Sequence, residues 1–119
     1  MDQALSPLQA SRLLSSLRPQ VMPPSGHAYA FGEPGRIGRA VAYAVARGDI
    51  GQAQVDTWFS GLVEDLGPRP QAGAEADWWR RRSNLQAFLN ALGYMLEGET
   101  QAPLVALAAS VRDTMRRLP

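Results

Sequence analysis

Residues 55–66 read Val-Asp-Thr-Trp-Phe-Ser-Gly-Leu-Val-Glu-Asp-Leu, and this stretch decides the fold class. Apolar residues return at every third or fourth position, which is the period of a helix with one buried face. Gly67 and Pro68 follow at once and end the pattern. The stretch therefore predicts an amphipathic helix. Its apolar stripe consists of Val55, Trp58, Phe59, Leu62, Val63 and Leu66.

The N-terminal part of the chain shows the same period. Ser6, Pro7 and Gln9 predict a helix start, because serine and glutamine side chains can cap free backbone N–H groups and proline is tolerated at the first helical position. Pro19 and residues 22–26 are expected to stop this helix and to form a stiff connection. The predicted buried face holds Leu8, Leu14, Leu17 and Val21.

A further helix is predicted from Glu33 to about Arg47, with Gly48 as its left-handed C-terminal cap. Residues 27–32, which precede it, are expected to form an extended lead-in. Residues 49–52 repeat the start signal and are expected to cap the helix that follows. The core face of this second helix would hold Ile37, Val41, Ala44 and Val45.

Two C-terminal segments predict the last two helices. One runs from about Glu75 to Glu97 and ends at Gly98, and the other is capped by Thr100 with Pro103 in its first turn. The expected buried residues are Trp78, Leu85, Phe88, Leu89, Leu92 and Met95 in the first and Leu104, Leu107, Ala108, Val111 and Met115 in the second.

The five predicted helices indicate an all-α fold. Short connections favour antiparallel helical hairpins, arranged either as a bundle or as stacked layers. We expect residues 1–119 to form a single helical domain, with an N-terminal helix and Pro-rich connection over 1–26 and a helical core over 27–119.

The composition restricts the class of protein. The 119 residues weigh 12.9 kDa and carry a net charge of +1 and no cysteine. A chain of this size hides about two-thirds of its surface on folding, so a partner subunit would help to stabilise it. The lack of cysteine excludes a disulfide and fits a reducing compartment, and no apolar run approaches the roughly 20 residues that a bilayer span needs. We expect a cytoplasmic protein that makes no membrane contact.

No motif favours an enzyme. His27 is the only histidine, which excludes a histidine-based metal cluster, and the sequence places no nucleophile and carboxylate beside it. Gly32, Gly35 and Gly38 lack the spacing and the flanking strands of a dinucleotide-binding fingerprint. We expect Gly35 and Gly38 to let another helix approach closely, and we expect no catalytic residue, cofactor or metal.

Residues 77–82, Asp-Trp-Trp-Arg-Arg-Arg, are the most unusual stretch. Because neighbouring helical residues point about 100° apart, only one of the two tryptophans can face the core. A tryptophan at the edge beside arginine has the composition of an interface anchor, although a long side chain could instead fold over the preceding loop. We predict a surface for a second copy or another protein. It comprises Trp78, Trp79, Arg80, Arg81 and Arg82.

A second surface gives the alternative function. All 12 basic residues are arginine, and arginine makes forked bonds to phosphate. The small net charge and the acidic residues between 49 and 65 disfavour a nucleic-acid partner, because nucleic-acid-binding domains usually carry a clear excess of basic residues. Nucleic acid is therefore the alternative partner, and protein is favoured. The alternative face comprises Arg36, Arg39, Tyr43 and Arg47.

Two further features predict local structure. Glu33 and Arg36 are three residues apart and are expected to form a local brace at the start of their helix. Asn84 adjoins the buried edge of the longest helix and is expected to hydrogen-bond a neighbouring loop.

Residues 31–41, Phe-Gly-Glu-Pro-Gly-Arg-Ile-Gly-Arg-Ala-Val, and residues 84–94, Asn-Leu-Gln-Ala-Phe-Leu-Asn-Ala-Leu-Gly-Tyr, resemble part of a known family. The resemblance covers about residues 29–96 and is to the C-terminal half of a bacterial, all-helical, HEAT-like family known only as a domain of unknown function. Pro34 and Gly35 stand where that family is usually acidic, and Gly93 interrupts its Leu-Tyr pair. The principal shared positions, which we take as a structural motif, are Gly32, Glu33, Arg36, Asn84, Phe88 and Tyr94.

The resemblance implies a helical layer rather than an activity. In a stacked helical array each repeat buries its face on the next, so one end of an isolated piece is left uncovered. The first helix or a second copy of the chain would then cover that end.

Overall fold

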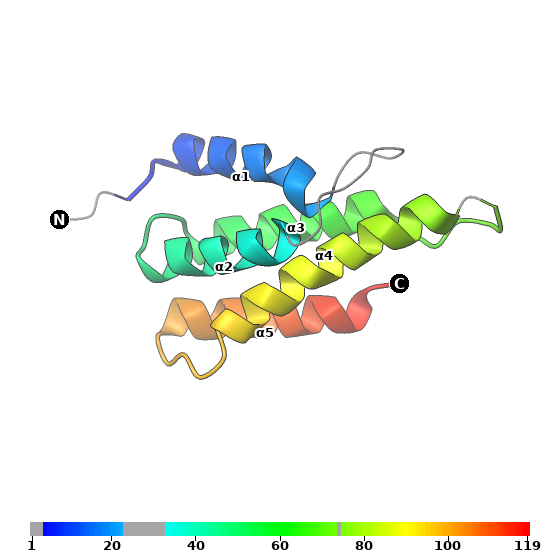
Figure 1. Cartoon of the computed structure of the whole chain (residues 1–119). Helices are drawn as coiled ribbons and strands as arrows, with labels where there is room; N and C mark the ends of the chain where they lie inside the picture. The colour runs from blue at the N-terminus through cyan, green and yellow to red at the C-terminus, as the bar shows by residue number, and fades with distance from the viewer. Residues whose placement is uncertain (1–3, 23–32, 74) are drawn as a thin grey trace.

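A computed structural model describes residues 4–22, 33–73 and 75–119, and these residues contain five α-helices and no strand (Figure 1). The predicted all-α fold is therefore confirmed. The predicted lead-in over 27–32, with His27 and Gly32, lies outside the described residues. The helices are α1 (Pro7–Val21), α2 (Glu33–Ala46), α3 (Gln52–Leu66), α4 (Glu75–Met95) and α5 (Ala102–Arg117).

The odd-numbered helices form one layer of the molecule (Figure 1). The Gln54 side chain donates to the backbone oxygen of Pro7 at 3.0 Å, close to the start of both α1 and α3. Arg18 and Asp65 form an ion pair close to the end of both helices. The two helices therefore run in the same direction, and α5 follows on the other side of α3.

Helices α2 and α4 form the second layer and pack on each other more extensively than any other pair. Gly38 allows this packing, because a Cβ atom there would lie 2.6 Å from the backbone oxygen of Phe88. The predicted role of Gly38 in a close helix approach is confirmed. The same prediction is wrong for Gly35, where the nearest atom to an added Cβ is the Arg39 guanidinium at 3.7 Å.

One hydrophobic core joins all five helices. Its two largest fully buried side chains are Phe59 of α3 and Phe88 of α4, and the Trp58 ring meets the Phe88 ring edge-on with centroids 5.5 Å apart. The predicted buried positions of α2 are all confirmed. Other residues that were predicted on buried faces are only half-buried and pack at the edge of the core: Leu17, Trp58, Val63, Met95 and Met115.

The helix ends agree with the sequence in part. Ser6 and Gln9 form the predicted capping box, with Gln9 N–H donating to Ser6 Oγ at 3.2 Å and Ser6 N–H to Gln9 Oε1 at 2.9 Å. Gly48 and Gly98 both have φ of +81°, as expected for the residues that end α2 and α4.

Four local predictions are wrong. Pro19 lies inside α1, because a proline removes only one helical hydrogen bond and the last turn continues to Val21. Leu8 is 60% exposed, because Ala10, Leu14 and Val21 form the buried face of α1 and Leu8 lies on the opposite side of the helix. Thr100 does not cap α5, which begins after Gln101 without a side-chain cap, and α3 likewise begins after Gly51 without one.

Candidate functional site

The tryptophan pair at the start of α4 divides as predicted, with one ring inside and one at the edge. Trp78 is only 5% exposed, and its Nε1–H donates to the backbone oxygen of Gly67 at 3.1 Å. This bond ties α4 to the end of α3. Trp78 therefore holds the α3–α4 connection together and presents little surface to a partner.

Trp79 is 40% exposed, but its ring is flanked by two guanidinium groups of the same chain. The Cζ atoms of Arg69 and Arg82 lie 5.3 Å and 5.5 Å from its ring centroid, within the range of cation–π attraction. Arg82 also donates to the backbone oxygen of Pro119 at 2.6 Å, which fastens the C-terminus to α4. Arg80 is exposed and Arg81 half-buried.

A carboxylate completes this cluster. Arg69 donates to Glu75 Oε2 from Nε at 2.8 Å and from Nη2 at 2.5 Å. The hydrogen bond from Arg69 lowers the pKa of Glu75 below its ordinary value of 4.5 and outweighs desolvation, which raises it. The arginine charge and a hydrogen bond from Trp79 lower this pKa further. Much of the predicted interaction surface is thus engaged within its own chain.

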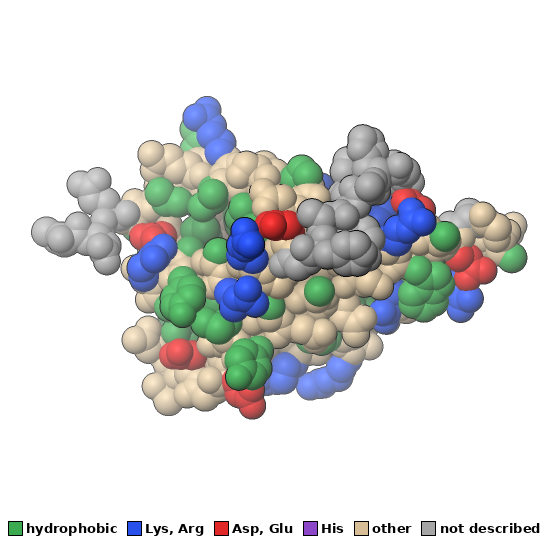
Figure 2. Space-filling view, viewed as in Figure 1, with side chains coloured by type: hydrophobic (Ala, Val, Ile, Leu, Met, Phe, Trp, Pro, Cys, Tyr) green, Lys and Arg blue, Asp and Glu red, His purple; other side chains and the backbone are tan. Residues whose placement is uncertain are grey.

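The side chains of the alternative, arginine-rich face are exposed to solvent. Arg36, Arg39 and Tyr43 of α2 are all exposed, and so is Arg47 in the turn after it. Two of the three arginines are paired, because Arg36 lies 3.6 Å from a Glu33 oxygen, as predicted for the brace, and Arg47 lies 3.1 Å from an Asp49 oxygen. On the described part of the face that α2 and α4 present, Figure 2 shows basic, acidic and hydrophobic side chains interspersed.

The described residues of the predicted structural motif differ in burial. Phe88 and Asn84 are buried, but the Asn84 Nδ2 atom has no hydrogen-bond partner among the described residues, so the predicted tie through this amide group is wrong. Tyr94 is 76% exposed and lines a groove instead of the core.

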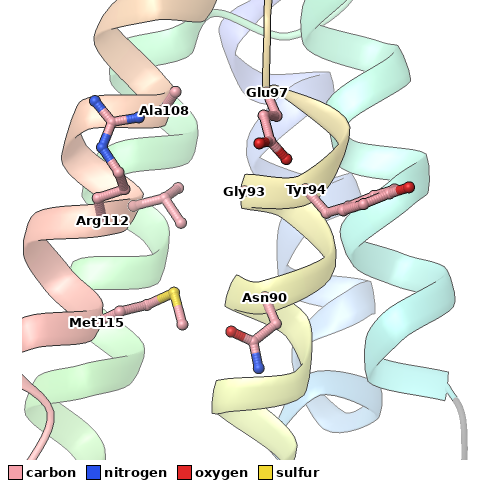
Figure 3. A pocket seen from close by; sticks show the side chains of 8 residues that line it. Asn90, Gly93, Tyr94, Glu97, Ala108, Arg112 and Met115 are labelled. Atoms are coloured by element: carbon pink, nitrogen blue, oxygen red, sulfur yellow. The ribbon is translucent and has the colours of Figure 1, made fainter.

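This groove separates α4 from α5 and has a volume of about 360 Å³. Figure 3 shows α4 and α5 as its two walls, with labelled side chains from both helices around the space between them. The floor is apolar, since Val111 is fully buried and Ala108 nearly so. The lining consists of Asn90, Gly93 and Tyr94 from α4, Glu97 from the turn after α4, and Ala108, Val111, Arg112 and Met115 from α5.

The polar groups of the groove are free to meet a partner. Glu97 and Arg112 are exposed at the same end of the groove on opposite walls (Figure 3), and neither forms an ion pair with any described residue. Asn90 and Tyr94 make no side-chain hydrogen bond within the described part of the chain. The groove therefore joins an apolar floor to one unpaired negative and one unpaired positive group.

Sequence reasoning missed this groove. Of its lining residues only Tyr94 was among the predicted motif residues, and it was assigned there to structure. The two walls come from consecutive helices, and the width of the space between them depends on their packing, which the sequence pattern does not give. The available signal was weak: Gly93 breaks the apolar side of α4 opposite Val111, whose Cγ1 would lie 3.3 Å from an added Cβ.

Two kinds of site are absent from the described residues. No three histidine, cysteine, aspartate or glutamate side chains gather there in a way that could hold a metal ion. None of the helices described is both long and apolar enough to cross a membrane.

Comparison with known proteins gives one match. The model of a family described as "Protein of unknown function (DUF2785)" matches residues 1–94. The match includes α1, which the sequence resemblance over residues 29–96 left out, and it stops before α5. No curated protein and no solved structure matches this chain.

Proposed function

The chain belongs to the DUF2785 family of proteins of unknown function, and we propose that it is a small helical protein-interaction module that self-associates. The proposal rests on the groove between α4 and α5, which combines an apolar floor with two unpaired charges. An apolar surface with a polar rim is typical of contact sites between proteins.

The arrangement of the helices supports this proposal. Each odd-numbered helix lies in one layer and each even-numbered helix in the other (Figure 1), as in HEAT-type stacks of helical hairpins. Along the chain, α1 of the first layer is followed by α2 of the second layer, and α3 of the first layer is followed by α4 of the second. The groove occupies the next position in the second layer, beside α4 and over α5. A stack of this kind leaves an end that another chain can cover.

The groove itself supports a binding role over catalysis. Its polar side chains, Asn90, Tyr94, Glu97 and Arg112, form no hydrogen bonds with one another. Catalysis by proton transfer or covalent attack requires paired groups within hydrogen-bond reach. We therefore propose no enzymatic activity, no cofactor and no metal for this chain.

The mass of the protein in solution tests the proposal. Light scattering coupled to size-exclusion chromatography, run over a wide range of protein concentrations, should show a species of twice 12.9 kDa that dissociates on dilution. A constant mass of 12.9 kDa at every concentration would remove the self-association and with it this function.

A nucleic-acid-binding role is the second candidate, because three exposed residues of α2 and Arg47 just after it form one face, with Arg39 free of any ion pair to the described residues. A gel shift with duplex and single-stranded oligonucleotides at low salt tests it, since phosphate contacts are strongest there. Binding that Arg39→Glu abolishes would favour this role; no shift at low salt would exclude it.

A further inference from the structure

The groove between α4 and α5 has an apolar centre that is open on one side. Val111 and Ala108 form the floor, and Gly93 leaves room above them because it has no side chain. Met115 lies half-buried further along the same wall as Val111. A partner that fills this centre would remove apolar surface from water, which favours association.

The charges at the rim restrict the partner. Glu97 stands on the α4 wall and Arg112 on the α5 wall, at the same level along the groove (Figure 3). A partner of one uniform charge, such as nucleic acid, would be attracted by one wall and repelled by the other. The groove is therefore matched by a surface that carries a positive group opposite Glu97 and a negative group opposite Arg112.

The same groove on a second copy is such a surface. A two-fold axis that runs along the groove, between α4 and α5, would place α4 of each copy over α5 of the other. This rotation preserves the level along the axis, so Arg112 would face the partner's Glu97 and Glu97 would face the partner's Arg112. A symmetric contact of this kind requires a self-complementary patch, and the pair of opposite charges at one level meets that requirement.

We propose that a second copy of this chain docks groove to groove and that two reciprocal ion pairs, Arg112 with the partner's Glu97 and Glu97 with the partner's Arg112, fix its register. This inference rests on the self-association proposed above and adds the surface and the symmetry to it. The apolar centre supplies most of the affinity, and the two charge pairs select the partner and its orientation.

Charge reversal tests the register. Arg112→Glu would bring two glutamates together in each ion-pair position, and Glu97→Arg would bring two arginines together. Each variant should raise the Kd of the dimer about tenfold or more, because facing like charges disfavour association. Both side chains are exposed, and circular dichroism should show unchanged helix content.

Mixing the two variants gives the sharpest result. In an equimolar mixture every ion-pair position of the mixed dimer again holds one glutamate and one arginine, so the affinity should return to near that of the original chain. The double variant Arg112→Glu/Glu97→Arg should dimerise for the same reason. Arg12→Glu, an equal charge change on exposed α1 at the opposite side of the molecule, is the matched control and should leave the Kd unchanged (Figure 1).

The outcomes separate this inference from the proposed function. A dimer whose Kd responds to neither reversal, or one that the mixture does not restore, would overturn groove-to-groove docking while leaving self-association in place. A chain that stays monomeric at every concentration would overturn both. Should Arg112→Glu unfold the chain, Arg112→Gln and Glu97→Gln remove both ion pairs without repulsion, and an unchanged Kd in these variants would equally contradict the inference.

Discussion

Gly38 of α2 lies directly against the backbone of Phe88 in α4, where a Cβ atom would come within 2.6 Å of the carbonyl oxygen. A backbone oxygen inside a helix cannot move aside as a flexible side chain can. The short distance between α2 and α4 is therefore possible only because residue 38 has no Cβ atom. The packing of the second layer depends on this glycine.

Gly38→Ala should consequently destabilise the fold. We expect a loss of about 1–3 kcal/mol in the free energy of unfolding, because the extra methyl group must push α2 away from α4. Gly35→Ala is the matched control on the same helix, where the new methyl group makes only ordinary van der Waals contact with Arg39 at 3.7 Å, and it should stabilise by about 0.5–1 kcal/mol. Urea unfolding of both variants checks the pair, and equal effects would contradict this packing.

Phe88→Ala tests the core at the same level of α4. The ring is fully buried and meets Trp58 edge-on, so its removal should cost about 3–5 kcal/mol. Tyr94→Ala removes another aromatic ring from the same helix, but one that is 76% exposed, and should change stability by less than about 0.5 kcal/mol. Thermal unfolding at low protein concentration separates these effects from self-association.

Glu75 gives a prediction for pH. Its pKa is lowered by Arg69, so the folded chain binds this proton less readily than the unfolded chain does. The stabilisation is present above the ordinary pKa of 4.5 and is lost as pH falls through the lowered value. Side-chain NMR titration should place the midpoint of Glu75 below 4.5, and Arg69→Met should return it toward 4.5. A midpoint that Arg69→Met leaves unchanged would show that the pair does not form.

Trp79→Ala compares the two candidate surfaces. Trp79 is 40% exposed, but the guanidinium groups of Arg69 and Arg82 already contact the ring. A partner would therefore compete with two groups of the same chain for contact with this ring. We expect Trp79→Ala to weaken the dimer less than Arg112→Glu does. The reverse order, measured by sedimentation at matched concentrations, would assign the contact to the tryptophan edge.

The sequence predicted the helices well because their period depends on local spacing alone. Val55, Phe59 and Leu62 lie on one face of α3 whatever packs against them, and all three are buried. Ser6 and Gln9 cap α1 through contacts three residues apart, which are also local. The prediction for Leu8 was wrong because this residue lies about 140° around the helix from the buried face that Ala10, Leu14 and Val21 form.

The groove could not be predicted in the same way. Glu97 follows α4 and Arg112 lies in α5, so the space between them depends on how these two helices pack. The sequence showed the residues but not the distance between the walls. The sequence around Trp79 predicted an interface residue. Its two cation–π contacts, with Arg69 and Arg82, depend on the fold and could not be predicted from the sequence.

The mass of the unaltered chain in solution, followed from dilute to concentrated protein, addresses self-association most directly. We expect it to rise from 12.9 kDa to twice that value and to stop there, since a two-fold contact closes on itself. A mass that never leaves 12.9 kDa, or one that grows without limit, would contradict a closed dimer.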